Sequence, residues 1–205
     1  MVVLRGGLFV SLLVLLSTFS KYEPAEIAPE KSRYKKISMQ GKEVALWQGP
    51  WACVLDTVTG LLWENKTDDE GIHDANWSYS WYIEGRGVAD SGDCYFEASR
   101  CDTHDLIRHM NEQETCARSN WRLPSSQELG SLISKQAIVG DAKIAKDFFS
   151  FTKRSVYWTS DHSQLLEPSM RHYGFGASVV DFKSGEIQVK PYSTAPFLRL
   201  VSGPI

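Results

Sequence analysis

Four cysteines, an even number, are the feature that most constrains the fold of this 205-residue chain. They are Cys53, Cys94, Cys101 and Cys116, and none of them has the C-x-x-C spacing typical of zinc sites. In an oxidising compartment such a set predicts two disulfide bonds, for which three pairings are possible. Only six residues separate Cys94 from Cys101, which suits a small local loop. We therefore take Cys94–Cys101 and Cys53–Cys116 as the working hypothesis.

The first twenty residues predict export from the cytoplasm. Arg5 supplies a positive charge, Leu8 to Leu16 form an apolar run, and a short tail of mostly small polar residues follows. This order is typical of a secretory signal peptide over residues 1–20. An uncleaved short anchor is the alternative, although the run is shorter than the about 20 residues of a membrane-spanning helix. We expect a periplasmic, cell-surface or secreted protein that meets a membrane only through an uncleaved N-terminus.

Residues 21–42 are predicted to be a basic linker, because they contain two prolines, six Lys or Arg and three Asp or Glu without an amphipathic period. Since the whole chain has a formal net charge of −3, the remaining domain, residues 43–205, is acidic. That balance argues against nucleic acid as a partner. The 42% of hydrophobic residues is enough for a globular core.

The predicted elements occur in the order strands, helices, strands. Two early runs around a Thr-Gly turn, 51–55 and 61–64, predict a hairpin. Asp102 is placed to cap a first helix, and Ser125 with Glu128 forms the S-x-x-E capping box of a second. Later strands are predicted at 156–159, 177–182, 186–189 and 197–201. This pattern indicates an α+β domain with an antiparallel sheet.

The chain has no phosphate-binding loop, no G-x-S-x-G elbow and no H-E-x-x-H helix. A cysteine nucleophile is disfavoured, because all four thiols are better used in disulfide bonds. These observations do not favour an enzyme.

A long loop, residues 65–92, carries the candidates for ligand contact. Trp77, Trp81 and Tyr82 offer flat apolar faces on which sugars can stack, with core packing as the alternative interpretation. Asp68, Asp69 and Asp74 offer closely spaced oxygen ligands of the kind that Ca²⁺ prefers. They lack the EF-hand arrangement, so a solvated loop without a cofactor is the alternative.

Eight ordered motifs resemble those of one bacterial family, the Lcl C-terminal domain, which is named after a collagen-like adhesin. They are W-A-C-V-L-D-T-V-T-G-L-L-W-E from Trp51, K-T-D-D-E-G-I-H-D from Lys66, S-W-Y from Ser80, C-D-T from Cys101, W-R-L-P-S-S-Q-E-L from Trp121, Y-W-T-S from Tyr157, V-D-F-K-S-G from Val180 and R-L-V from Arg199. The resemblance covers nearly all of residues 51–201. The R-L-P-[ST]-x-x-E block is also similar to the formylglycine-generating-enzyme and C-type-lectin-like superfamily, which implies a C-type-lectin-like fold with long loops.

The resemblance implies an exported binding or adhesion module. The namesake domain binds sulfated glycosaminoglycans as a trimer, which suggests a carbohydrate or surface polymer as partner and a homo-oligomer as assembly. This chain has no collagen-like repeats, and its domain is acidic. The alternative is a structural subunit of a surface assembly. We assign Trp51, Trp63, Trp121 and Trp158 to the fold, and expect Arg122 to pair with an acid.

Overall fold

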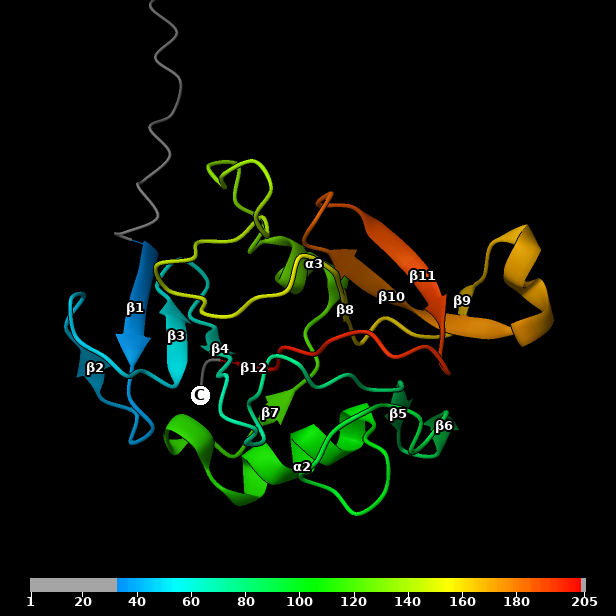
Figure 1. Ribbon diagram of the computed structural model, residues 1–205, viewed down its shortest axis with the longest axis horizontal. Helices are drawn as coiled ribbons and strands as arrows, with labels where there is room; N and C mark the ends of the chain where they lie inside the picture. Colours follow the sequence, from blue (N-terminus) through cyan, green and yellow to red (C-terminus); the bar gives the residue numbers. More distant parts are fainter. Residues whose placement is uncertain (1–32, 204–205) are drawn as a thin grey trace, which may run out of the picture.

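Short antiparallel strands make up most of the regular structure in a computed structural model, which describes residues 33–203 (Figure 1). The largest sheet has six strands in the order β2-β1-β3-β4-β12-β7. Its centre is the predicted hairpin, in which Val54 lies opposite Trp63. The six strands are β1 (Tyr34–Ile37), β2 (Glu43–Val44), β3 (Cys53–Asp56), β4 (Leu62–Glu64), β12 (Val201–Ser202) and β7 (Trp121–Arg122).

Strand β1 corrects the predicted linker, which was expected to continue to Lys42. Tyr34 is buried, and its ring contacts those of Phe148 and Phe149 with centroids 5.5 and 5.2 Å away. Lys36 is also buried, and its ammonium stands 3.6 Å from the centre of the Trp51 ring. The prediction from charge composition treated Lys36 as solvated. It therefore placed the start of the fold too late in the chain. The predicted signal peptide lies outside the described residues.

A second sheet packs beside the first and has the order β11-β10-β8, with β9 also paired to β10. Hairpin β10–β11 turns at Ser184-Gly185, and Gly185 has the positive φ of 85° that this turn requires. A small two-stranded sheet pairs β5 with β6. The bounds are β8 (Val156–Trp158), β9 (Gln164–Leu165), β10 (Phe175–Asp181), β11 (Ile187–Pro191), β5 (Tyr82–Ile83) and β6 (Arg86–Gly87).

Both predicted helices form with their predicted caps. The Asp102 carboxylate accepts the first backbone N–H groups of α2, and Ser125 with Glu128 closes a capping box on α3. Helix α3 is short, and the long segment after it has no regular structure. The helical elements are α2 (Thr103–Glu112), η1 (Thr115–Ala117), α3 (Ser126–Gly130) and η2 (Pro168–Tyr173).

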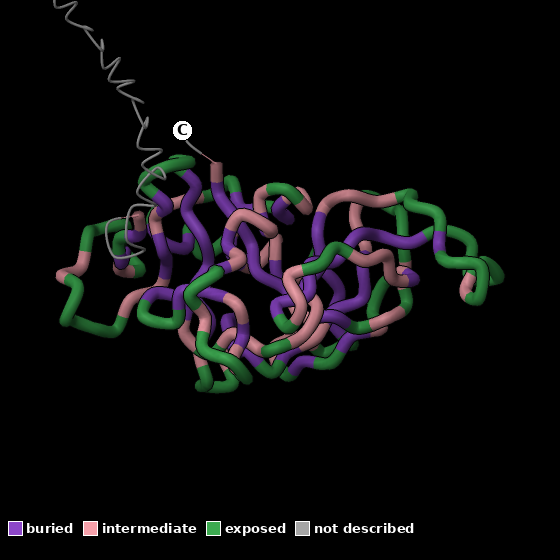
Figure 2. Tube along the Cα trace, turned by 90° about the horizontal axis from the view of Figure 1, so that it is seen from above, coloured by how far each residue is buried: buried purple, intermediate pink, exposed green. Residues whose placement is uncertain are grey.

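The two disulfide bonds join Cys53 to Cys116 and Cys94 to Cys101, which confirms the predicted pairing. Buried side chains form two clusters, one containing Trp81 and Trp158 and the other containing Trp63 and Phe182. Figure 2 shows the buried segments running through the body, while η2 stands on an exposed arm at one end. The predicted α+β class with antiparallel sheets is confirmed. Within residues 33–203, no helix is long and apolar enough to cross a membrane.

Candidate functional site

The predicted sugar-stacking rings are largely inside the domain. Trp77 is 7% exposed and Trp81 is 1% exposed, whereas Tyr82 is half-buried. The Trp77 indole N–H donates to the Gly71 carbonyl oxygen at 2.7 Å, and its ring meets that of Tyr95 at 4.8 Å. A ring held in this way has no free face for a sugar.

Trp81 is enclosed in the same manner. Its indole N–H donates to the carbonyl oxygen of Thr159 at 2.9 Å. The rings of His162 and Tyr192 lie 5.3 and 5.0 Å from it, the histidine in a stacked arrangement. Both tryptophans therefore follow the alternative interpretation, core packing under the long loop, and we do not carry them forward as ligand contacts.

The predicted calcium ligands are engaged in hydrogen bonds within their own loop. Asp74 accepts the backbone N–H groups of Glu70 and Asn76 at 2.8 and 2.7 Å. Burial opposes ionisation of Asp74, but these N–H donors outweigh it and lower its pKa. Asp69 accepts the Gly71 N–H at 3.0 Å, and Asp68 accepts the Asn76 side-chain amide at 3.3 Å. These bonds shape the loop, and calcium binding there stays a prediction.

Directly behind this loop lies a buried ionic cluster centred on Glu64, the last residue of β4. The Lys66 ammonium lies 2.7 Å from one Glu64 oxygen, and Nδ1 of His73 lies 3.0 Å from the same oxygen. The other oxygen accepts the Leu200 N–H at 3.0 Å. Burial opposes ionisation, but Lys66 and His73 outweigh it and lower the pKa of Glu64 to about 2.

Arg199 extends this cluster and is completely buried. Its guanidinium donates to the backbone oxygen of Glu64 and, at 2.8 Å, to the Thr152 hydroxyl, and it lies 5.1 Å from the Phe149 ring centre. The cluster thereby joins β4, the long loop of residues 65–92 (the acidic loop) and the segment that leads into β12. All its members come from the family motifs quoted above. Because the groups are buried and, apart from His73 Nε2 and Arg199 Nε, bonded within the protein, we assign the cluster to holding the fold.

The charged residues of the W-R-L-P-S-S-Q-E-L motif pair with each other. Arg122 forms two hydrogen bonds of 2.8 Å with the Glu128 carboxylate, as predicted for an arginine that pairs with an acid.

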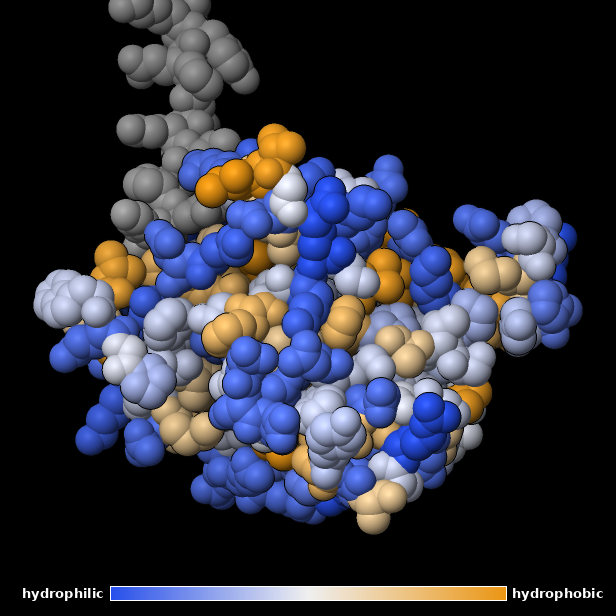
Figure 3. Space-filling view, viewed as in Figure 1, coloured by the Kyte–Doolittle hydropathy of each residue, from blue (hydrophilic) through white to orange (hydrophobic). Residues whose placement is uncertain are grey.

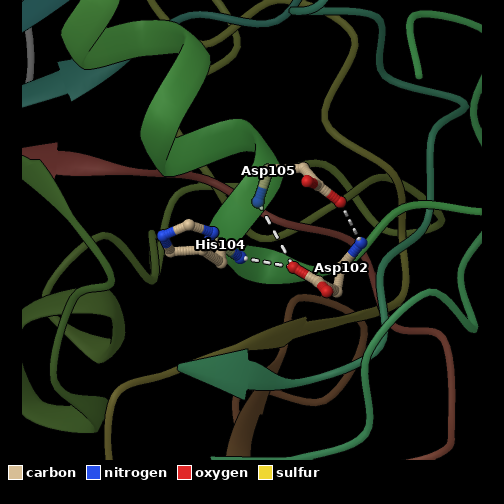
Figure 4. Close-up of side chains that lie close together, drawn as sticks. All are labelled: Asp102, His104 and Asp105. Carbon is tan, nitrogen blue, oxygen red and sulfur yellow. Dashed lines mark hydrogen bonds between the residues drawn. The ribbon is translucent and has the colours of Figure 1, made fainter. Parts of the chain in front are cut away.

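Within residues 33–203, the acid and histidine side chains close enough to share a metal ion are Asp102, His104 and Asp105 at the start of α2 (Figure 4). The Asp102 and Asp105 carboxylates there bind the backbone N–H groups of the cap, so the helix itself explains this cluster.

The structure instead draws attention to an exposed tryptophan that the sequence patterns did not single out. Trp47 is 88% exposed, although a ring of this size is usually packed against the protein. Its neighbour Leu46 lines a groove of about 280 Å³ between the β1–β2 hairpin and the segment around Phe148. Figure 3 shows that hydrophilic side chains cover most of one face of the domain, with hydrophobic ones in small separate groups. The groove is lined by Tyr34, Lys35, Lys36, Glu43, Val44, Leu46 and Phe148.

The charged side chains that line the groove are fixed by hydrogen bonds and an ion pair, which give the groove a defined shape. The Lys36 ammonium donates to the Leu46 carbonyl oxygen at 3.0 Å. Lys35 and Glu43 form an exposed ion pair of 2.9 Å at the hairpin. The available sequence signal was weak: Trp47 lies two residues before a Gly-Pro pair, which is typical of a turn and hence of an exposed position.

Comparison with known proteins gives one match. The sequence profile of the Lcl C-terminal domain matches residues 52–202, which includes every member of the buried ionic cluster. No curated protein and no solved structure matches the chain, so the C-type-lectin-like fold stays a prediction. The groove is built largely from residues that precede the matched region. From the match over most of its length, the chain belongs to the Lcl C-terminal domain family.

Proposed function

We propose that this protein is an exported, non-catalytic binding module that holds a carbohydrate in the groove beside Trp47. The observation that carries the proposal is the 88% exposure of Trp47, whose chain neighbour Leu46 lines a concave surface. Ligand sites are typically concave and combine apolar walls with a few polar groups. The two disulfide bonds support an oxidising compartment, and hence export.

The groove offers the two kinds of contact that a sulfated sugar requires. Trp47 provides a free aromatic face against which the C–H groups of a sugar ring can pack. Lys35 is paired with Glu43, and the buried Lys36 ammonium donates to the Leu46 carbonyl oxygen, so the two lysines and one acid leave the lining with one net positive charge. This sign differs from that of the domain as a whole, which is acidic. This local charge favours an anionic polysaccharide over a neutral one.

Calorimetry with heparin and with neutral dextran tests the proposal on the exported protein. We expect binding to heparin that weakens as salt concentration rises, and weaker or no binding to dextran. Trp47→Ala should reduce the affinity about tenfold or more, because burying roughly 100 Å² of apolar ring contributes about 2.5 kcal/mol. Repeating the titration with Ca²⁺ and with a chelator tests the predicted role of Asp68, Asp69 and Asp74.

Phe175→Ala is the matched control, because Phe175 is also an exposed aromatic, 53% accessible, and lies on β10. It should leave the affinity for heparin unchanged. If Trp47→Ala binds heparin as tightly as the unaltered protein, or if neither polysaccharide binds, the groove is not a carbohydrate site.

A second function is favoured by a separate observation. The burial of Trp77 and Trp81 agrees with a structural subunit of a surface assembly, in which the loop aromatics belong to the core. In that case the isolated protein should bind no glycan, and Trp47 should become protected from solvent only in the assembled surface structure. Tryptophan oxidation followed by peptide mapping, on free protein and on intact cells, separates the two functions.

A further inference from the structure

Strand β11 is an uncovered edge. It is the outermost strand of the second sheet, with β10 on one side only (Figure 1). An unpaired strand edge presents free backbone groups to which another strand can bind. Five residues form β11, and Ile187 at its start is 57% exposed.

The other sheet edges of residues 33–203 are short or covered. Strands β2, β5, β6 and β9 have two residues each. The edge of β7 is occupied by Asn111, whose side chain exchanges two hydrogen bonds with the backbone of Trp121. The edge of β8 bonds to Phe197, which accepts the Trp158 N–H. Among the described strands, β11 therefore has the longest open edge.

Hydrogen-bond alternation shows which backbone groups of β11 point outward. Asp181 donates its N–H to the Glu186 carbonyl oxygen, so this opposite pair is a hydrogen-bonded one. Bonded and non-bonded pairs alternate along an antiparallel ladder, and the register aligns Val179 with Gln188. Glu186, Gln188 and Lys190 accordingly bond toward β10. The N–H and carbonyl groups of Ile187 and Val189 point away from the sheet, and no described residue bonds to them.

We propose that β11 pairs with β11 of a second copy of this chain, antiparallel and about a two-fold axis at Gln188. In this register Ile187 lies opposite Val189 of the second copy, and the outward groups of both residues form four backbone hydrogen bonds. The same register puts Glu186 of each copy opposite Lys190 of the other copy, which gives two pairs of opposite charge. A lysine on an edge strand ordinarily repels a partner strand, but here the acid four residues earlier makes the edge self-complementary.

The dimer is weak. Two five-residue edges bury far less than the about 1,200 Å² of a stable interface, so the association is seen at high protein concentration or when it is trapped. Closely spaced copies on a surface would pair more readily than free ones, because their effective concentration is higher.

A cysteine trap tests the register. All four native cysteines of the chain are in disulfide bonds, so Gln188→Cys introduces the single free thiol. Opposite residues of a non-bonded antiparallel pair have Cα atoms about 4.5 Å apart, within the range of a disulfide bond. We expect Gln188→Cys to form a covalent dimer readily under mild oxidation. Lys190→Cys is the matched control, because the two copies of residue 190 would lie about 14 Å apart.

Charge reversal tests the pairing of Glu186 with Lys190. In the Gln188→Cys background, Lys190→Glu and Glu186→Lys should each lower the yield of covalent dimer severalfold, and the two changes together should restore it. The proposal is overturned if Gln188→Cys gives no more dimer than Lys190→Cys, or if the doubly reversed variant pairs no better than the single ones. Circular dichroism of each variant separates loss of pairing from loss of folding.

Discussion

The Lys66 ammonium lies 2.7 Å from a Glu64 carboxylate oxygen, and both side chains are buried. Only Asn65 separates the two residues, and strand β4 ends at Glu64. The pair therefore determines the direction in which the chain leaves the large sheet and enters the acidic loop. Around it, His73 brings a later part of that loop, and Arg199 the segment before β12, to the same point.

Removing one partner of this pair should be strongly destabilising. Lys66→Met leaves the Glu64 carboxylate buried with His73 and one N–H as its remaining partners, and breaking a buried ion pair typically costs about 3–5 kcal/mol. Urea denaturation measures the free energy of unfolding. Lys146→Ala is the control, because its ion pair with Asp141 is exposed and should contribute about 1 kcal/mol or less. Equal losses in the two variants would show that the buried pair is not a main support of the fold.

The same cluster predicts acid sensitivity. The pKa of Glu64 is about 2 in the folded protein, below the 4.5 of a glutamate in an unfolded chain. Protonation of Glu64 therefore favours the unfolded chain. The stability that this group contributes is complete above pH 4.5 and is lost as the pH falls toward about 2. In Glu64→Gln the free energy of unfolding should be lower at neutral pH and should fall less steeply over this window. Parallel slopes for the two proteins, from urea titrations at each pH, would contradict the assignment.

The family motifs contain Glu64, Lys66, His73 and Arg199, but no sequence pattern predicted that these four residues meet. Trp77, Tyr79 and Trp81 alternate along the chain, and in an extended segment alternate side chains lie on the same side. Alternation cannot say whether that side faces solvent or core, and here all three rings are buried. The decisive contacts come from distant residues, such as Thr159 and Tyr192, which no local pattern connects to Trp81.

Charge composition predicted the start of the folded domain less reliably than capping residues predicted the helices. The basic composition around Lys35 and Lys36 predicted a linker, yet Lys36 is buried against Trp51 in a strand of the main sheet. A lysine carries a long aliphatic chain, so its charge alone does not exclude it from a packed strand. Capping residues were more reliable, because Asp102 and Ser125 act on the backbone within three residues of themselves.

The two disulfide bonds should differ in their contribution to stability. Cys53–Cys116 closes a loop with a sequence separation of 63, and Cys94–Cys101 one of 7. On the chain-entropy model the longer bond contributes about 4 kcal/mol and the shorter about 2.5 kcal/mol. Paired alanine substitutions, Cys53→Ala with Cys116→Ala and Cys94→Ala with Cys101→Ala, test this by urea denaturation. A larger loss from the shorter bond would show that the loop it closes carries structure beyond chain entropy.

Gly92, close to the Cys94–Cys101 disulfide bond, should not tolerate a side chain. Its N–H donates to the Cys101 carbonyl oxygen at 2.8 Å, and a Cβ atom at this position would lie 2.3 Å from the backbone oxygens of both Cys101 and Ser78. Backbone atoms cannot move aside as a flexible side chain can, so we expect Gly92→Ala to reduce the free energy of unfolding by about 1–3 kcal/mol. Gly130→Ala is the matched control, because nothing lies within 4 Å of the added methyl group and alanine favours a helix. Thermal and urea unfolding of both variants should therefore show a loss at Gly92 and no loss at Gly130, and a tolerated Gly92→Ala would mean that the 92–101 contact is looser than these distances require.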